Sequence, residues 1–329
     1  MFVRCSRIGS IHVRRQARSN MSTIGFIGLG HMGSKMVANI SNDGHDLVVY
    51  DANPDAATQL ASPKVTPAVS VEEVASQCST IISMLPNDAA VNAVSADILK
   101  HSPSGTLHIG CSTVSPTTSR RLAMEYANAG KCFVASPVFA RPDGLQRRQA
   151  VWMIAGDEQG RKTAAGLLES SGQVVDYGSD VGSANVVKLC GNFLIASSIE
   201  AISEAMALSE KHGVDRTEVI KLLSSTIFDC LIYKGYGQRV SERDHRPGGF
   251  SLELGLKDVS LVSQAAREAD TPMPFLSVLL DRFTSAKARG RGQFDWSAIG
   301  LSAGEDAGID LASDIAKNKK AVETGDVYK

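Results

Sequence analysis

The fold is decided by the stretch Ile24-Gly-Phe-Ile-Gly-Leu-Gly-His-Met-Gly33. Its apolar start predicts a buried strand over residues 23–28, and the periodicity after it predicts a helix over residues 32–41. Gly28 permits a tight turn, Gly30 lets the backbone approach a pyrophosphate, and Gly33 lets helix and strand pack closely. The start of the helix adds free N–H groups and a partial positive charge. This context favours a dinucleotide site over a purely structural glycine turn. The predicted cofactor contacts are Gly28, Leu29, Gly30, His31, Met32 and Gly33.

A second predicted strand, over residues 46–50, ends at Asp51. A carboxylate about 20 residues after the glycines is expected to accept hydrogen bonds from the adenosine ribose. The same charge repels a 2′-phosphate, and residues 52–54 contain no Arg or Lys that would hold one. Asp51 therefore favours NAD as cofactor, with NADP still possible. The alternative for Asp51 is a local turn at the end of the strand.

Apolar strands alternate with helices as far as about residue 176, which predicts an α/β fold with a doubly wound, mostly parallel sheet. The further predicted strands are 80–84, 106–109, 131–135, 151–155 and 173–176, and the further predicted helices are 71–76 and 116–129. Beyond residue 181 helical periodicity dominates. A long apolar helix is predicted over 183–212, followed by helices over 252–269, 275–289 and 306–320. We therefore expect a dinucleotide-binding domain over 21–181 and an all-α domain over 182–329.

The long helix carries apolar residues on several faces, so it suits a spine between domains or a subunit interface. It predicts a homo-oligomer, either a homodimer or a homotetramer. The net charge is −1, with 34 basic and 35 acidic residues, which gives no reason to expect a nucleic acid or an anionic membrane as partner. Gly, Ser and charged residues interrupt the apolar runs, so no transmembrane segment is expected. The six cysteines are scattered, which predicts neither a disulfide framework nor a metal site.

The first twenty residues hold five arginines and several serines, and no acidic residue occurs before Asp43. This composition is typical of a mitochondrial transit peptide. The alternatives are a disordered basic extension, or translation that starts at Met21 and gives a cytoplasmic protein.

Several motifs in order resemble those of the β-hydroxyacid dehydrogenases, a family that includes 3-hydroxyisobutyrate dehydrogenase and, more distantly, 6-phosphogluconate dehydrogenase. They are the glycine-rich stretch, Met84-Leu-Pro86, Cys111-Ser-Thr-Val-Ser-Pro116, Gly182-x5-Lys188-x3-Asn192, Lys211-His-Gly-Val-Asp215 and Gly255-Leu-Lys-Asp258. The resemblance implies a Rossmann domain joined by a long helix to an all-α domain. It also implies hydride transfer between a nicotinamide and a small 3-hydroxy acid or aldehyde acid.

The resemblance also implies roles for single residues. Lys188 would be the general acid/base, because a partly desolvated lysine can exchange a proton near neutrality. Asn192 lies four residues on, on the same helical face, and would hold the substrate or orient the lysine. Without the resemblance, this pair would be taken for a solvated face. The residues expected at the cofactor are Leu85, Pro86, Thr113 and Lys257, and Ser112 is expected at the substrate. Asp258 is expected to be structural, and residues 115–116 also suit a helix start.

One loop departs from the family pattern, in which Ser-Gly-Gly follows the fifth strand and holds the substrate carboxylate. Here these positions are Phe139, Ala140 and Arg141. Either Arg141 binds a carboxylate in a bidentate pair, or it points to solvent and Phe139 lines an apolar pocket.

The sequence leaves three candidate functions: a dehydrogenase of hydroxy acids or aldehyde acids, a reductase of imines or uncharged carbonyls, and a non-catalytic cofactor-binding oligomerisation module. Relatives with either of the last two functions lack a lysine at the position of Lys188, so the presence of Lys188 counts against both.

Overall fold

The computed structural model describes residues 23–328, so the extension predicted over residues 1–20 lies outside the described part. The N-terminal half is built on a nine-stranded sheet with the order β3-β2-β1-β4-β5-β6-β8-β7 and with β9 beside β8. The strands are β1 Ile24–Ile27, β2 Leu47–Tyr50, β3 Val65–Pro67, β4 Thr80–Ser83, β5 Leu107–Gly110, β6 Cys132–Ala135, β7 Val138–Phe139, β8 Ala150–Gly156 and β9 Gly172–Asp176.

Strands β1 to β6 pair in parallel, while β8 runs antiparallel to β6 and β7. The predicted α/β class with a doubly wound, mostly parallel sheet is confirmed. Strands β3 and β7 were not predicted, because runs of three and two residues are too short to show a period of two.

Strand β1 shows how the sheet is covered on both faces. Ile24 and Phe26 belong to one hydrophobic core, whereas Ile27 belongs to the core on the other face. The helices of this half are α1 Gly33–Asn42, α2 Pro54–Gln59, α3 Val71–Gln77, α4 Asp88–His101, α5 Pro116–Asn128, α6 Pro142–Gln146 and α7 Glu158–Leu168, with the short 3₁₀ helix η1 Glu169–Ser171. Parallel strands buried on both faces explain the nearly continuous apolar runs in the sequence.

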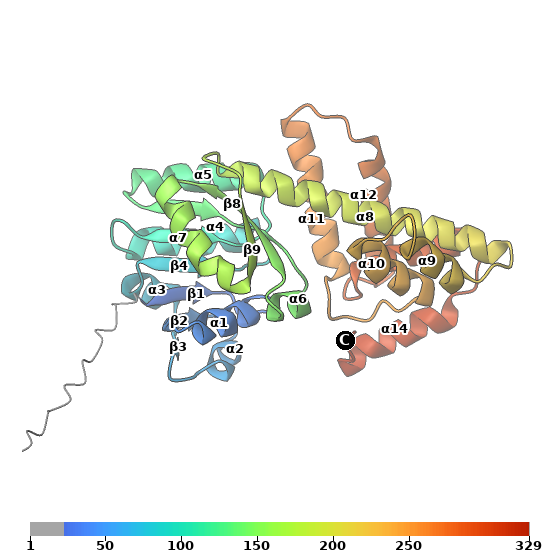
Figure 1. The fold of residues 1–329 in the computed structure, drawn as a ribbon, viewed down its shortest axis with the longest axis horizontal. Helices are drawn as coiled ribbons and strands as arrows, with labels where there is room; N and C mark the ends of the chain where they lie inside the picture. The colour runs from blue at the N-terminus through green and yellow to red at the C-terminus, as the bar shows by residue number, and fades with distance from the viewer. Residues whose placement is uncertain (1–22, 329) are drawn as a thin grey trace, which may run out of the picture.

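A single helix, α8 (Gly182–Lys211), leads from the sheet into the helical half, within one residue of its predicted bounds. It packs on α5 and β8 near its start and on α10, α11 and α13 further along (Figure 1). By length and composition α8 could cross a membrane, since an 18-residue window has a mean hydropathy of 1.4. Its Gly and Ser residues therefore interrupt the apolar run less than the sequence suggested. The core helix of a soluble protein passes the same test, and 39% of this window is buried.

The rest of the described chain is helical and encloses a separate core. Its helices are α9 Arg216–Ser224, α10 Leu231–Glu242, α11 Leu252–Glu268, α12 Pro274–Ala288, the 3₁₀ helix η2 Trp296–Ile299, α13 Gly300–Asp306 and α14 Ala312–Thr324. The rings of Tyr236, Phe250 and Phe283 surround Trp296 in this core. The single helix predicted over 306–320 is wrong: the chain turns at Gly308, whose φ is +70°, and begins α14 at Ala312.

Candidate active site

The glycine-rich turn lies at the carboxyl edge of β1, next to β4, where the strand order reverses direction. Gly28 has a φ of +96°, and a methyl group there would lie 2.3 Å from the Met84 carbonyl oxygen. A methyl group on Gly33 would lie 1.9 Å from the Gly28 carbonyl oxygen, so helix and turn are in direct contact. A methyl group on Gly30 would meet nothing within 4 Å. The turn is therefore closed on the protein side and open on the outer side.

The start of α1 is also available to a ligand. Its N-cap residue, Met32, gives no side-chain hydrogen bond to the first turn, whereas Ser70, Asn87 and Ser115 cap the neighbouring helices α3, α4 and α5. Gly30 and His31 are exposed. Uncapped N–H groups beside an open glycine fit the pyrophosphate of a dinucleotide.

Asp51 follows β2 at the same edge, and backbone groups hold both of its carboxylate oxygens. Leu29 N donates to Oδ2 at 2.7 Å, and Asn53 N donates to Oδ1 at 2.8 Å. The bond from Asn53 N is the local turn that was the alternative interpretation of Asp51, and it is present together with the bond from Leu29 N. The carboxylate is thus fixed beside the glycine-rich turn and keeps acceptor capacity for hydroxyl groups.

Two further loops complete this edge. Leu85, after β4, donates its backbone N–H to Ser112 Oγ at 2.7 Å. Ser112 is buried, and its hydroxyl ties the β4 and β5 loops together; its place at the substrate stays a prediction. Pro86 is exposed, and Thr113 is partly buried with its carbonyl oxygen turned toward the helical half.

Lys188 lies on α8 against the loop that departs from the family pattern. Its Nζ is 4.4 Å from the centroid of the Phe139 ring. Within residues 23–328 it forms no hydrogen bond or ion pair. Burial lowers the pKa of Lys188 to about 8, the charge of Asp258 opposes this shift, and the charge of Lys257 adds to it. The amine therefore exchanges a proton close to neutral pH.

A chain of polar contacts lies beside this lysine and joins the two halves of the molecule. Asn192 donates from Nδ2 to Asp258 Oδ2, and both side chains are buried. Lys257 Nζ forms an ion pair with Asp258 Oδ1 at 2.8 Å and donates to the Thr113 carbonyl oxygen at 2.8 Å. The contacts hold α8, α11 and the β5 loop in one arrangement.

The remaining predicted substrate residues lie on the same loop as Phe139. Ala140 is partly buried, and Arg141 lies 5.9 Å from the ring centroid of Tyr236 on α10. Arg141 is 32% exposed by side chain, so it neither points freely into solvent nor is fully enclosed. The structure thus brings Lys188, Asn192, Thr113, Lys257 and Phe139 together, with Arg141 further out.

Asp258 has the structural role that the sequence predicted, since it links Asn192 to Lys257. Sequence reasoning missed one residue of this cluster. Gly191 was not singled out, although a methyl group there would lie 2.2 Å from Phe139 Cζ. A glycine inside a helix costs stability, and that was the available signal.

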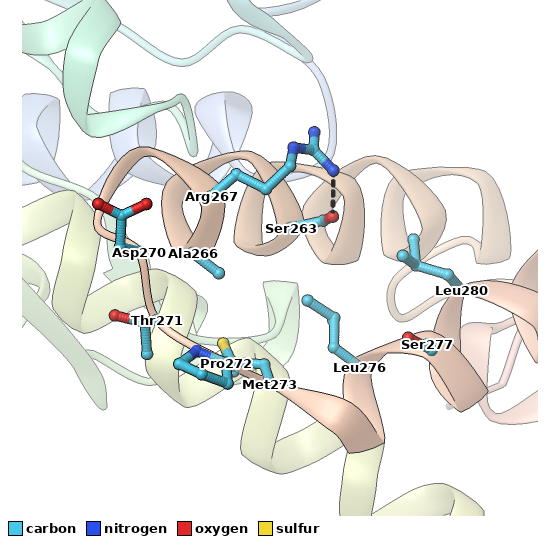
Figure 2. A pocket seen from close by; sticks show the side chains of 10 residues that line it. All are labelled: Ser263, Ala266, Arg267, Asp270, Thr271, Pro272, Met273, Leu276, Ser277 and Leu280. Atoms are coloured by element: carbon cyan, nitrogen blue, oxygen red, sulfur yellow. Dashed lines mark hydrogen bonds between the residues drawn. The ribbon is translucent and has the colours of Figure 1, made fainter.

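The molecule also has a solvent-open groove of about 390 Å³ between α11 and α12 (Figure 2). It is lined by Ser263, Ala266, Arg267, Asp270, Thr271, Pro272, Met273, Leu276, Ser277 and Leu280. None of the predicted site residues is among them, and Arg267 is already bonded to Ser263 at 2.8 Å. The residues that the sequence predicted for the chemistry therefore lie outside this groove.

Comparison with known proteins agrees with this architecture. Residues 23–179 match the model of the NAD binding domain of 6-phosphogluconate dehydrogenase, and residues 182–301 match the NAD-binding model of NADP-dependent 3-hydroxyisobutyrate dehydrogenase. The oxidoreductase YfjR of Bacillus subtilis is 31% identical over 84% of this chain and 98% of the relative. The probable mitochondrial 3-hydroxyisobutyrate dehydrogenase of Dictyostelium discoideum is 30% identical over 88% of this chain and 92% of the relative.

Among solved structures, the 3-hydroxyisobutyrate dehydrogenase of Mycobacterium tuberculosis with L-serine has a TM-score of 0.78 and 28% identity, covering 86% of this chain and 99% of that one. An imine reductase from Bacillus cereus shares the fold at a TM-score of 0.58 and 18% identity, covering 84% of this chain and 97% of that one. The family resemblance and the predicted nicotinamide cofactor are confirmed. The chain belongs to the 3-hydroxyisobutyrate dehydrogenase family of NAD(P)-dependent oxidoreductases.

Proposed function

We propose that this enzyme transfers a hydride between a nicotinamide cofactor and a small 3-hydroxy acid or aldehyde acid, with Lys188 as the general acid/base. The observation that carries the proposal is the position of Lys188. Its amine lies against the Phe139 ring, unpaired within the described chain, and burial lowers its pKa to about 8. A proton-transfer group is most effective when its pKa lies near the working pH.

The residues divide the work as follows. When alcohol is oxidised, neutral Lys188 accepts the hydroxyl proton while the substrate C–H bond breaks; when carbonyl is reduced, protonated Lys188 returns the proton. The bound nicotinamide supplies the hydride acceptor or donor. Asn192, held by Asp258, orients the substrate oxygen or the lysine. In this proposal Lys257, anchored on the Thr113 carbonyl oxygen, contacts the cofactor.

The cofactor loops of this proposal are the glycine-rich turn with Leu29, His31 and Met32, the Leu85–Pro86 segment, and Thr113. Asp51 supports a preference for NAD over NADP, because its carboxylate is fixed where the adenosine ribose is expected. NADP remains the second candidate. The proposed division into a cofactor domain over 21–181 and a substrate and oligomerisation domain over 182–329 follows from the two separate cores.

Reduction of an uncharged carbonyl or an imine is the second candidate function. The observation that favours it is the apolar Phe139 ring beside Lys188, where the family pattern has a hydroxyl group. Lys188 and the bonded Asn192–Asp258 pair favour the first candidate. They also argue against a non-catalytic cofactor-binding module.

The test is an assay of hydroxy acids with NAD and with NADP, followed at the absorbance of the reduced nicotinamide. Oxidation should rise with pH through about 8, because it needs the neutral amine, and reduction of aldehyde acids should fall through the same range. Turnover of uncharged carbonyls or cyclic imines alone would support the second candidate. Cofactor binding without turnover of any of these compounds would contradict both.

We also propose that the enzyme is a homodimer or homotetramer. Several large apolar side chains of the helical half are exposed in the single chain: Leu194, Leu208, Leu222, Ile227 and Leu231. A contiguous apolar surface marks a contact with another chain, and these residues are our candidates for such a surface. Light scattering on the purified protein should give a mass of two or four chains, and the mass of one chain would contradict the proposal.

A mitochondrial location is the last part of the proposal. It rests on the basic composition of residues 1–20 and on the names of eukaryotic relatives, such as the mitochondrial 3-hydroxyisobutyrate dehydrogenases of Drosophila melanogaster and Mus musculus. A fluorescent fusion of the full chain should enter mitochondria, and a fusion that starts at Met21 should stay in the cytoplasm. Identical distribution of the two fusions would contradict it.

A further inference from the structure

Phe139 and Gly191 are fitted to each other on the face of α8 that carries Lys188. A methyl group on Gly191 would lie 2.2 Å from Phe139 Cζ and 2.5 Å from Cε1, so the ring occupies the space that a side chain would fill. Gly191 is three residues from Lys188 and adjacent to Asn192, and residues three and four apart share one helical face. The ring therefore forms a wall directly beside the amine and the buried amide.

This wall is unfavourable for an anion. The face of an aromatic ring carries negative charge density, and a carboxylate taken out of water needs hydrogen bonds or a paired charge. Phe139 provides neither. A carboxylate attached close to the reacting carbon would have to lie against this ring.

Arg141 lies two positions after Phe139, in extended backbone (φ −98°, ψ 163°) that leads into α6. Its guanidinium lies 5.9 Å from the ring centroid of Tyr236 and 6.0 Å from that of Tyr328. Among the described residues it makes no hydrogen bond, and its nearest acid, Asp143, is 4.0 Å from Nε. The N–H groups of its guanidinium are thus available to a ligand.

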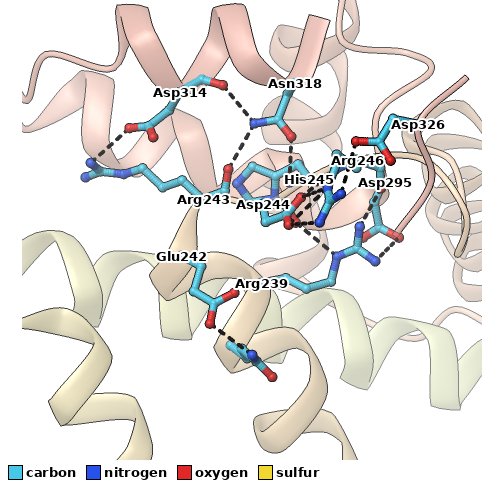
Figure 3. A network of polar contacts seen from close by, with 11 residues as sticks. Arg239, Glu242, Arg243, Asp244, His245, Arg246, Asp295, Asp314, Asn318 and Asp326 are labelled. Atoms are coloured by element: carbon cyan, nitrogen blue, oxygen red, sulfur yellow. Dashed lines mark hydrogen bonds and ion pairs between the residues drawn. The ribbon is translucent and has the colours of Figure 1, made fainter. Parts of the chain in front are cut away.

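The neighbouring arginines, Arg239 and Arg246, already form ion pairs with acidic residues. Arg239 is buried, pairs with Asp295 and lies 4.0 Å from the Tyr328 ring centroid. Arg246 pairs with Asp244 at 2.6 Å and with Asp326 at 3.1 Å (Figure 3). These contacts fix the C-terminal segment against α10, so Tyr328 and Tyr236 form a rigid surface near Arg141.

We propose that Phe139, seated on Gly191, excludes an anionic group from the position beside Lys188 and that Arg141 binds that group instead. The enzyme then selects hydroxy acids and aldehyde acids whose carboxylate is separated from the reacting carbon by two or more methylene groups. A planar guanidinium binds such a carboxylate in a bidentate pair. The inference rests on the hydride transfer and the role of Lys188 in the proposed function, and it replaces the 3-hydroxy acid of that proposal by acids with a longer chain.

The wild-type test compares oxidation of 3-hydroxypropanoate, 4-hydroxybutanoate, 5-hydroxypentanoate and uncharged 1-butanol with NAD and with NADP. We expect kcat/KM for 4-hydroxybutanoate or 5-hydroxypentanoate to exceed that for 3-hydroxypropanoate at least about tenfold. An equal or higher value for 3-hydroxypropanoate would overturn the inference and leave the proposed function standing. Failure of all three acids, with NADH still bound, would instead contradict the proposed function.

Variants then assign the effect to the two residues. Arg141→Gln should lower kcat/KM for the preferred acid about 100-fold and leave 1-butanol unchanged, because a charge-assisted bidentate pair is lost. Arg147→Gln is the matched control, since it removes an exposed cation of the same segment that pairs with Asp143. An equal loss in both variants would overturn the role of Arg141.

Phe139→Ser should raise the rate with 3-hydroxypropanoate relative to the longer acids, since it restores a donor beside Lys188. Phe139→Leu keeps the wall apolar and should retain the wild-type chain-length preference. A NADH titration of each variant establishes that the protein is folded. If Phe139→Ser leaves the chain-length preference unchanged, Phe139 does not determine specificity.

Discussion

The glycine-rich turn and the wall formed by Phe139 and Gly191 are built differently. The turn is made of backbone groups within six consecutive residues, and its first and last glycines, Gly28 and Gly33, leave no room for a side chain while Gly30 is open. The wall is the ring of Phe139 on β7 seated on Gly191 of α8, and these two residues are 52 positions apart in the sequence. The cofactor half of the site is therefore encoded locally, while the substrate half depends on how the two halves of the chain pack.

The largest change in activity is expected at Lys188, where substitution should affect turnover but not cofactor binding. Lys188→Ala should lower kcat about 10³-fold, because positioned proton transfer contributes on the order of 10²–10⁴. Binding of NADH should be unchanged, since the glycine-rich turn is untouched. Lys211→Ala, at the exposed far end of α8, is the control and should be as active as the wild type. Turnover that survives Lys188→Ala would remove the lysine from the mechanism.

The next test is within the turn itself. Gly33→Ala forces a methyl group to 1.9 Å from the Gly28 carbonyl oxygen and should cost about 2 kcal/mol of unfolding free energy or more. Gly30→Ala meets nothing within 4 Å and should change that free energy by less than about 0.5 kcal/mol, yet weaken NADH binding. Urea unfolding and a NADH titration measure the two quantities. Equal losses of unfolding free energy in the two variants would contradict the finding that a side chain at Gly30 meets no protein atom.

The same contrast explains how far the sequence could be interpreted. Gly28, Gly30, Gly33 and Asp51 could be assigned because their spacing along the chain is that of a dinucleotide-binding turn. The link between Asn192 and Asp258 could not, because these residues are 66 positions apart and nothing in either local pattern names the partner. The same holds for Ser112: its position at the sheet edge was predictable, but its bond to Leu85 was not.

A pair of opposite changes should test the polar chain beside Lys188. The charge of Asp258 raises the pKa of Lys188 and that of Lys257 lowers it. Asp258→Asn should therefore move the rise of alcohol oxidation to lower pH, and Lys257→Met should move it to higher pH. The measurement is kcat/KM against pH for each variant. Shifts of the same sign would show that the titrating group is not Lys188.

The smallest expected effect returns to the local region, at Asp51. Its carboxylate disfavours a 2′-phosphate and is held by Leu29 N and Asn53 N. Asp51→Ser should raise the ratio of NADP to NAD efficiency about tenfold, because one repulsive charge near a phosphate corresponds to roughly 1–2 kcal/mol in a partly exposed site. Asp55→Ser, in the first turn of α2, is the matched control, since it removes an acid from the same segment without touching the turn. If both variants change the ratio equally, the effect is one of general charge, and the carboxylate of Asp51 does not contact the ribose. If only Asp51→Ser changes it while the chain-length preference of the substrate stays the same, cofactor choice and substrate choice are encoded in separate parts of the site.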